Sequence, residues 1–502
     1  MLRIIQKYPL YLFLLPVFFV MHGFVENLGF IDWKEAMLLL LSYWGLTFSI
    51  AFFSYLFFRN WNRAALITTF WMSFFFFFGA MHEFLKEHSP IRLFTRYSFL
   101  LTAALSILFI LFIYFKKTKK PFHRFSVYLN SLLLIYILLD LGTAVWKTTN
   151  PNNSNRFSVY DFGKQNSYKV CDTCTKNDIY LLLFDEYGNP LSLKEQYGFN
   201  NDIDSFLQSR GFQVQFHSRS NYNFTAFSMA SAFNMSYISG IKDIKAVTAE
   251  DYANSTLLVR DNEAIKLLDA QGYEIVNYSV FDLAGNPSMV NQSFLPLKTK
   301  LLSDRTLFAH LNKDIGWLLI TRFPFNLFKQ NHFLKHRDNN VKFHDLTIQA
   351  SSKKSAKPRF IYSHFYLPHP PYFYDKDGVE KDETTIYNEY TSNPPESYLE
   401  YVLYTDKKIK ELVDTIQHND PKATIIVLSD HGYRAKNSTQ YNQFFRNLNA
   451  VYYPDKNYTG FYDSITSVNQ FRVIFNKLFN QQFPLQKDST ILLIDKIALP
   501  NK

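Results

Sequence analysis

The stretch TIIVLSDHGY, residues 424–433, runs from an apolar β-like segment directly into Asp430 and His431. An earlier stretch, IYLLLFDEYG at residues 179–188, has the same form and ends its apolar run with an Asp-Glu pair. Near-continuous apolar strands are typical of a parallel sheet covered on both faces, and such sheets bind ligands at the carboxyl ends of their strands. The two stretches therefore predict that acidic and imidazole side chains meet at one edge of a sheet.

The side chains at this predicted edge are Asp185, Glu186, Asp430 and His431. Carboxylate oxygens together with an imidazole nitrogen are suitable ligands for zinc or a comparable divalent cation. Each pair on its own is more often a turn or a helix cap than a set of metal ligands. Their occurrence at equivalent strand ends favours a metal site.

The polar half of the chain alternates short apolar runs with segments of helical periodicity. We expect strands over residues 179–184, 212–217, 273–278, 360–365 and 424–429. We expect helices over residues 201–209, 262–270 and 397–417. This alternation predicts an α/β/α sandwich with a mostly parallel central sheet.

The first 146 residues are more apolar than the rest of the chain and suit a membrane environment. They carry five apolar stretches, at about residues 10–28, 36–58, 64–81, 97–115 and 127–146. Each is close to the roughly 20 residues that an α-helix needs to cross a membrane. A cleaved signal peptide would account for the first stretch only, and a soluble bundle does not fit runs that are apolar on every face. We therefore expect an α-helical transmembrane bundle of about five spans.

Lys and Arg are concentrated in alternate loops of this bundle. They precede the first span and occupy the second and fourth loops, as Arg3, Lys7, Arg59, Arg63 and the cluster Lys116, Lys117, Lys119, Lys120 and Arg124. Because basic residues favour cytoplasmic loops, the pattern predicts a cytoplasmic N-terminus and an extracytoplasmic chain after Trp146. The expected domains are a transmembrane domain at 1–146, a linker at 147–177 and a catalytic α/β domain at 178–502.

Several ionisable residues fall near the outer ends of the predicted spans: His22, Glu26, His82, Glu83 and Asp140. Ionisable groups at membrane depth are costly unless they face a partner or a water-filled cavity. They predict either a polar pocket, which a lipid headgroup could occupy, or ordinary capping and pairing of the helices.

Charge and cysteine content narrow the range of partners. The formal net charge is +10, yet the polar half has no Lys/Arg block interleaved with aromatic residues, so no nucleic-acid partner is expected. The two cysteines, Cys171 and Cys174, cannot by themselves supply the four ligands of a structural zinc site. They predict a local disulfide in an oxidising compartment, with free thiols or a redox motif as the alternatives.

The Ser-Asp-His-Gly motif at residues 429–432, placed after an apolar strand, resembles that of the alkaline phosphatase/sulfatase superfamily. The resemblance extends from residue 179 to about residue 454. In that family the first strand also ends in an acidic metal ligand, which corresponds here to Asp185. The resemblance implies a divalent metal bound by Asp185, Asp430 and His431. Zinc is the first expectation, and manganese, magnesium and calcium are the alternatives.

The family's nucleophile is a Ser, Thr or Cys that opens a helix after the first ligand. Here the segment SNYNFTAFSMASAFNMSYI at 220–238 places Thr225 at that position, in a Thr-Ala-x-Ser pattern similar to that of phosphoethanolamine transferases. The resemblance implies that Thr225 is both the nucleophile and a metal ligand. A simple N-cap is the plain alternative, and Ser228 and Ser231 are lesser candidates. A sulfatase would need Cys-x-Pro-x-Arg or its serine version, and this segment lacks both Pro and Arg.

The segment RFIYSHFYLPHPPYFYD at 359–375 resembles the family region in which a His before Pro contacts the transferred group or a second metal. This match makes His369 a candidate catalytic residue, whereas His364 lies within the strand and is interpreted as structural. The chain lacks the further His that family transferases often carry after Ser-Asp-His-Gly. Either a second metal is absent or another group, such as Arg434, takes that role. Glu186 is either a second ligand or an adjacent cap.

Five spans followed by such a domain resemble the phosphoethanolamine transferases and lipoteichoic-acid synthases. The resemblance implies metal-dependent transfer of a phosphoryl-linked headgroup, of phosphoethanolamine or phosphoglycerol type, from a membrane phospholipid to an envelope glycan or lipid through a phosphothreonine. The alternatives are an envelope phosphodiesterase, phosphatase or sulfatase-like hydrolase, and a non-catalytic envelope scaffold. A glycan at the sequon Asn223-Phe-Thr225 would obstruct the nucleophile, so a bacterial cytoplasmic (inner) membrane is the expected location.

Overall fold

The computed structural model describes residues 8–28, 30–118, 120, 122–149, 157–159, 168–290, 299–314, 332–436 and 438–495. Three of the basic residues used for the topology, Arg3, Lys7 and Lys119, lie outside these ranges, as does much of the predicted linker. The chain divides into two compact units. The helical unit comprises Met1–Asn155 with Pro296–Pro324, and the α/β unit comprises Arg156–Leu295 with Phe325–Lys502.

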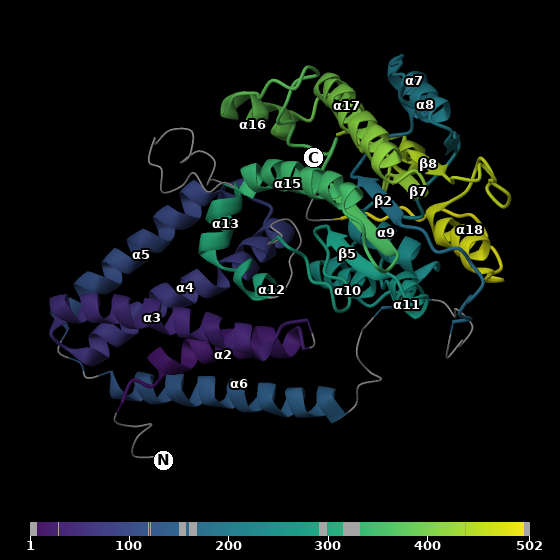
Figure 1. Cartoon of the computed structure of the whole chain (residues 1–502). Coiled ribbons are helices and arrows are strands. Elements are labelled where there is room, and N and C mark those ends of the chain that lie inside the picture. The colour runs from purple at the N-terminus through teal and green to yellow at the C-terminus, as the bar shows by residue number, and fades with distance from the viewer. Residues whose placement is uncertain are drawn as a thin grey trace. The chain divides into compact units, whose positions relative to one another are not determined.

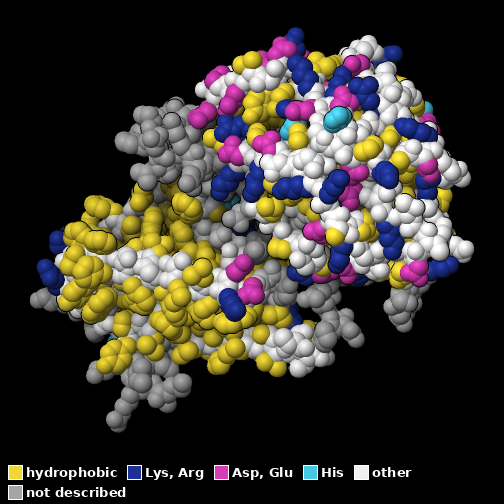
Figure 2. Space-filling view, in the orientation of Figure 1, with side chains coloured by type: hydrophobic (Ala, Val, Ile, Leu, Met, Phe, Trp, Pro, Cys, Tyr) yellow, Lys and Arg dark blue, Asp and Glu magenta, His cyan; other side chains and the backbone are white. Residues whose placement is uncertain are grey.

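The helical unit contains the apolar helices that the sequence predicts. They are α2 (Tyr11–Glu26), α3 (Trp33–Phe58), α4 (Trp61–His88), α5 (Tyr97–Lys117) and α6 (His123–Thr149), with the short 3-10 helix η1 (Arg92–Thr95) before α5. Within the described residues, four of them, α3 to α6, are long and apolar enough to cross a membrane, and α2 is a shorter apolar helix. Hydrophobic side chains cover much of the visible surface of this unit in Figure 2, as expected of helices that face lipid.

Polar caps set where two of these helices begin. The Asp32 side chain accepts the N–H of Lys34 at 2.7 Å before α3, and the Asn60 side chain accepts the N–H of Arg63 at 3.2 Å before α4. Such caps satisfy the free N–H groups of a first helical turn. Both helices therefore start one turn earlier than the apolar stretches that predicted them.

A segment of the polar half belongs to the helical unit. It forms α12 (Lys300–Ser303), which contacts α2, and α13 (Leu307–Asp314), which contacts α4. The Arg305 carbonyl accepts the N–H of Gly79 at 2.9 Å, and a Cβ at Gly79 would lie only 2.7 Å from that oxygen. The predicted boundaries placed all of residues 178–502 in one domain. The two compact units instead assign this segment to the helical unit. Its packing against α4 is a long-range contact, which no local sequence pattern reveals.

The α/β unit is built on a six-stranded sheet in the order β3-β8-β7-β2-β6-β5. The strands are β2 (Ile179–Phe184), β3 (Gln213–Val214), β5 (Glu274–Tyr278), β6 (Arg359–Phe365), β7 (Thr424–Leu428) and β8 (Asn449–Tyr452). β2, β5, β6 and β7 are parallel, and β8 is antiparallel to its neighbours β7 and β3. The predicted mostly parallel sheet is confirmed. β8 is a strand that the sequence analysis missed.

Helices cover both faces of the sheet, which confirms the predicted sandwich (Figure 1). The helices α15 (His332–Ser352) and α17 (Pro395–Asn419) pack together on one face. The other face carries α9 (Thr225–Asn234), α11 (Glu263–Ala270) and α18 (Ser467–Phe479). The remaining elements are α7 (Pro190–Tyr197), α8 (Ile203–Ser209), α10 (Ala249–Arg260), α16 (Glu383–Ser392), η4 (Tyr441–Phe445), β1 (Ser158–Val159) and β4 (Ile238–Ser239).

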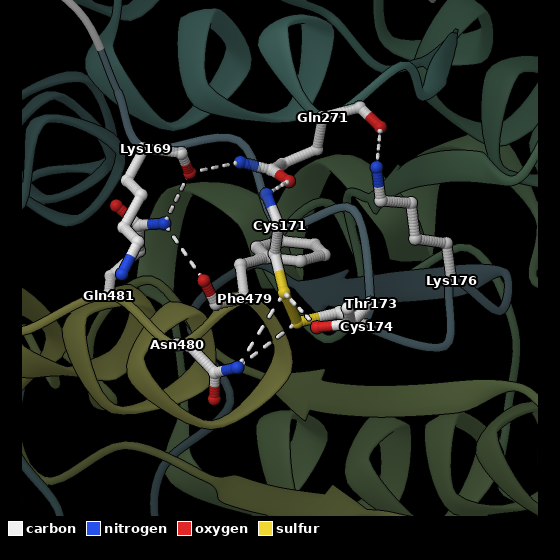
Figure 3. The surroundings of a disulfide bond; sticks show 9 residues. All are labelled: Lys169, Cys171, Thr173, Cys174, Lys176, Gln271, Phe479, Asn480 and Gln481. Carbon is white, nitrogen blue, oxygen red and sulfur yellow. Dashed lines mark hydrogen bonds between the residues drawn. A yellow bond between two sulfur atoms is a disulfide. The ribbon is translucent and has the colours of Figure 1, made fainter.

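Cys171 and Cys174 form a disulfide, as the first interpretation of this pair expected (Figure 3). The Asn480 side-chain amide lies 3.6 Å from the Cys171 sulfur and 3.5 Å from the Cys174 sulfur, and Gln271 accepts the N–H of Cys171 at 3.1 Å. These contacts join the segment before β2 to the ends of α11 and α18. Because the disulfide precedes β2, it belongs to the amino end of that strand and not to the edge where ligands of a parallel sheet bind.

Candidate metal centre

Parallel pairing brings the two acidic motifs to one level of the sheet. β2 and β7 are neighbours, and Leu183 lies opposite Leu428 in their register. Asp185 and Asp430 each follow two residues later, so both leave the sheet at the same height on its carboxyl edge. A neighbouring pair of parallel strands thus places side chains that are far apart in the chain within reach of one ligand.

Asp185, Asp430 and His431 form one buried cluster, in which each residue offers a ligand atom within 4.8 Å of the others. The Nε2 atom of His431 lies 3.3 Å from Oδ2 of Asp430 and 3.8 Å from Oδ1 of Asp185. The three side chains are at most 1% exposed. Three of the residues that the family resemblance implies as ligands therefore lie together.

Several buried polar atoms here lack a hydrogen-bond partner in the described part of the chain. They are both carboxylate oxygens of Asp185, Oδ2 of Asp430 and Nε2 of His364. An unsatisfied buried polar group costs about 1–3 kcal/mol, and more when it is charged, so several of them at one place call for an explanation, of which a bound ion is one. Oxygen and nitrogen donors converging in this way fit a divalent metal ion.

The electrostatics of the cluster lead to the same conclusion. Burial raises the pKa of Asp185 well above its usual range, and the nearby charge of Asp430 raises it further. Burial also lowers the pKa of His431 well below its usual range, with Arg434 adding to the effect. A neutral imidazole can bind a metal through its free nitrogen, and a cation would offset the repulsion between the two carboxylates.

Thr225 is the first residue of α9, and its hydroxyl oxygen lies 3.4 Å from Nε2 of His431. It makes no capping hydrogen bond, because the N-cap position of α9 is Phe224 and no side chain caps that end. The two lesser candidates donate their hydroxyls to backbone carbonyls, Ser228 to Asp430 and Ser231 to Ser236. Of the three hydroxyls, only that of Thr225 faces the cluster.

Glu186 does not join the three-residue cluster. Its backbone is left-handed, with φ of 62°, which turns the carboxylate towards Arg434. There Oε1 accepts the Arg434 N–H at 2.8 Å and lies 3.3 Å from the guanidinium Nε. Burial would raise the pKa of Glu186, but Arg434 and His369 more than offset this, and the pKa is lowered. Glu186 is thus an ionised partner that positions Arg434 beside the cluster.

The two histidines of the 359–375 segment lie on different sides of this arrangement. His369 Nε2 lies 3.3 Å from Glu186 Oε2 and 3.3 Å from Arg434 Nη2. His364 Nε2 lies 3.7 Å from Asp185 Oδ2, because β6 pairs with β2 so that His364 stands opposite Leu183. Burial lowers the pKa of His364 to about 4, so the ring is neutral. Its place beside a strand-end ligand is the signal that the sequence analysis left unused.

The fold is an α/β sandwich, and these donors form a candidate centre for a divalent metal at the carboxyl edge of its mostly parallel sheet. A family model described as Sulfatase matches residues 165–482, and the chain belongs to this family. The protein is therefore a sulfatase-like enzyme, joined to apolar helices suited to a membrane. No curated protein matches the chain.

The solved structures to which the chain is similar include two C-terminal periplasmic domains. The C-terminal periplasmic domain of EcEptC from Escherichia coli is 11% identical over 67% of this chain and 92% of that chain, with a TM-score of 0.37. The corresponding domain of the phosphoethanolamine transferase EptC from Campylobacter jejuni is 15% identical over 64% and 95%, with a TM-score of 0.37. A phosphonate monoester hydrolase of Agrobacterium radiobacter is 11% identical over 61% and 74%, with a TM-score of 0.38.

Proposed function

We propose that the protein transfers a phosphoryl-linked headgroup, of phosphoethanolamine or phosphoglycerol type, from a membrane phospholipid to a glycan or lipid of the cell envelope. The observation that carries the proposal is the position of the Thr225 hydroxyl. It begins a helix, points at the metal cluster and is 3.4 Å from His431. A hydroxyl so placed can act as a nucleophile that holds the phosphoryl group covalently between two displacements.

In the first displacement the Thr225 hydroxyl loses its proton to solvent and its oxygen forms a bond to phosphorus, and the bond from phosphorus to the diacylglycerol oxygen breaks. A divalent metal, with zinc as the first expectation, would be held by Asp185, Asp430, His431 and the Thr225 oxygen. It would lower the pKa of the Thr225 hydroxyl and offset charge on the phosphate. The first N–H groups of α9 face the same region and favour an anion. Arg434, positioned by Glu186, would bind the phosphate oxygens, and His369 would protonate the leaving diacylglycerol oxygen.

In the second displacement an acceptor hydroxyl forms the new bond to phosphorus, and the Thr225 oxygen leaves and regains a proton. His369 would take the proton of the acceptor hydroxyl. This returns His369 to the protonated form in which it began the first displacement. With water as the acceptor, the same residues would give a phosphodiesterase. Family membership keeps this hydrolase as the second candidate, because sulfatases transfer their group to water.

The proposed location is the bacterial cytoplasmic membrane, with the α/β unit outside the cytoplasm. Basic residues in alternate loops support this orientation. The Cys171–Cys174 disulfide supports an oxidising compartment for the α/β unit.

The test uses the full-length protein with zinc in vesicles that contain fluorescent phosphatidylethanolamine or phosphatidylglycerol. Release of diacylglycerol should fall by about a thousandfold or more in Thr225→Ala, because this variant lacks the proposed nucleophile, and Thr225→Ser should keep a measurable fraction. Intact mass should show a headgroup adduct on the parent and none on Thr225→Ala. The exposed Ser209→Ala serves as the control. Equal release by Thr225→Ala and the parent would exclude covalent catalysis from this residue.

A further inference from the structure

A pocket of about 350 Å³, lined mainly by residues with polar side chains, lies beside the loop that joins β7 to β8. Its lining residues are Arg219, Asn442, Gln443, Phe445, Arg446 and Thr490, and we call it the Arg219 pocket. All of them belong to the α/β unit. None of them belongs to the metal cluster, Glu186, Arg434 or His369.

The Arg219 pocket carries an excess of positive charge. Arg446 pairs with Glu195, whereas the guanidinium of Arg219 has no hydrogen-bond or ion-pair partner among the residues that the structure describes. Gln443 uses its side-chain oxygen to accept the hydroxyl of Ser192, which leaves its amide N–H groups for a ligand. Guanidinium and amide donors without a protein acceptor are the groups that bind carboxylates and phosphates.

Backbone hydrogen bonds hold the two arginines side by side. Arg219 and Arg446 form an antiparallel bridge, and the N–H of Ser220 donates to the Phe445 carbonyl at 2.7 Å. The N–H of Asn189 donates to the Arg446 carbonyl at 2.9 Å. The pocket is therefore built into the fold and does not depend on flexible surface side chains alone.

The same framework connects the pocket to the metal centre. The N–H of Gly432, next to His431, donates to the Phe444 carbonyl at 2.8 Å. A Cβ at Gly432 would lie 2.2 Å from the Gln443 carbonyl, so this close approach requires glycine. Arg219 precedes Thr225 by six residues, which limits their separation to about 20 Å. Both walls of the pocket thus continue segments that carry metal-centre residues.

We propose that the Arg219 pocket binds the anionic group of an acidic sugar, a phosphate or a carboxylate, on the acceptor that receives the headgroup. This inference rests on the proposed function, and it narrows the acceptor to an acidic glycan. The guanidinium of Arg219 binds the anion, Arg446 adds positive charge nearby, and Asn442, Gln443 and Thr490 provide polar groups for sugar hydroxyls. The position near Thr225 suits an acceptor whose hydroxyl must reach the phosphothreonine.

Binding is measured by calorimetry with the full-length protein in detergent and zinc, using glucose 6-phosphate, glucuronate and glucose as probes. We expect glucose 6-phosphate or glucuronate, or both, to bind about tenfold or more tightly than glucose. Whichever of these two binds more tightly shows whether the pocket prefers a phosphate or a carboxylate. Arg219→Gln should weaken that binding about tenfold or more, and Arg219→Lys by less, because lysine keeps the charge without the planar fork. The control is Arg210→Gln, an exposed arginine paired with Asp414 in the same unit.

Equal binding of glucose and the anionic sugars would overturn the proposal. So would unchanged binding in Arg219→Gln combined with its loss in Arg434→Gln, since the anion would then sit at the metal centre. The assay needs no turnover, so it is independent of the proposed function. Sugar binding by a protein that releases no diacylglycerol would refute the transferase while leaving the pocket as an acidic-sugar site. Release without sugar binding would refute the pocket alone.

Discussion

Two clusters of charged residues in this protein differ in how their charges are paired. In the helical unit, His22 lies 3.0 Å from Asp140 and 3.3 Å from Glu26, and Arg305 lies 3.7 Å from Glu26. Each carboxylate there has a basic group nearby, and of the described carboxylate oxygens in this cluster, Oδ2 of Asp140 alone is buried without a hydrogen bond. In the metal centre, three carboxylate oxygens and an imidazole nitrogen are left without one.

The difference shows how to separate a structural charge cluster from a ligand site. Paired charges complete their interactions within the fold, and half-exposed pairs contribute little free energy. Buried charges without partners are unfavourable until a ligand binds, so several of them gathered at one place indicate a binding site. By this criterion the helical cluster fits the helix-pairing interpretation, and the metal centre fits a bound cation.

The largest expected effect tests the metal centre directly. Asp430→Asn should lose most of the bound metal, because it removes one of two carboxylate ligands. The metal-free variant should unfold at no lower temperature than the metal-stripped parent, since Asn keeps an oxygen that can accept the N–H groups of Glu186 and His431. Elemental analysis and thermal unfolding measure the two outcomes, with the exposed Asp414→Asn as the control. Full metal retention in Asp430→Asn would contradict the ligand assignment.

His364→Gln sharpens the boundary of the same site. Its Nε2 faces Asp185 Oδ2, and residues that support a metal ligand typically change affinity by about ten- to a hundredfold when replaced. We expect zinc affinity, measured by competition with a coloured chelator, to fall by that amount. His344→Gln, another buried histidine of the α/β unit, should bind zinc like the parent. Unchanged affinity in His364→Gln would return this residue to the structural role that the sequence suggested.

Asp406 is a buried carboxyl of an intermediate kind. It has hydrogen-bond partners, unlike the free oxygens of the metal centre, but these partners are neutral. Asp406 accepts from the Tyr187 hydroxyl and from Asn201 at 3.2 Å, and burial raises its pKa from 3.8 to about 7. Its protonated form stabilises the fold below the unfolded pKa, and this stability is lost as pH rises through about 7.

From pH 4 to pH 8, Asp406 should thus lower the free energy of unfolding by up to about 4 kcal/mol, and Asp406→Asn should remove that dependence. Thermal unfolding of the full-length protein across this pH range measures the slope. Parallel pH profiles for the parent and Asp406→Asn would contradict the assigned pKa.

The smallest effect belongs to the helical cluster. His22→Ala should lower the free energy of unfolding by about 1 kcal/mol or less, because the side chain is 45% exposed and its pairs are screened. Zinc content and diacylglycerol release should match the parent. A large loss of release with zinc retained would instead support the lipid-headgroup pocket that these residues also suggested.

Most strands, the apolar helices and the candidate ligands can be predicted from the sequence, because they depend on local patterns. A run such as residues 179–184 is apolar throughout and is followed at once by Asp185, so both the strand and its polar end can be recognised without a partner strand. The same holds for residues 424–429 and Asp430. The roles assigned to Asp185, Thr225, His369, Asp430 and His431 stay predictions that the variants above test.

Contacts between residues that are distant in the chain become visible in the folded molecule alone. The four-residue strand β8 is recognisable by its pairing with β7, and residues 299–314 join the helical unit through contacts with α2 and α4. The left-handed backbone at Glu186 directs its carboxylate towards Arg434 and away from the metal cluster. The register of the strands places His364 beside Asp185. The Arg219 pocket joins segments more than 200 residues apart. Such contacts depend on register and packing between elements, which no local window of sequence contains.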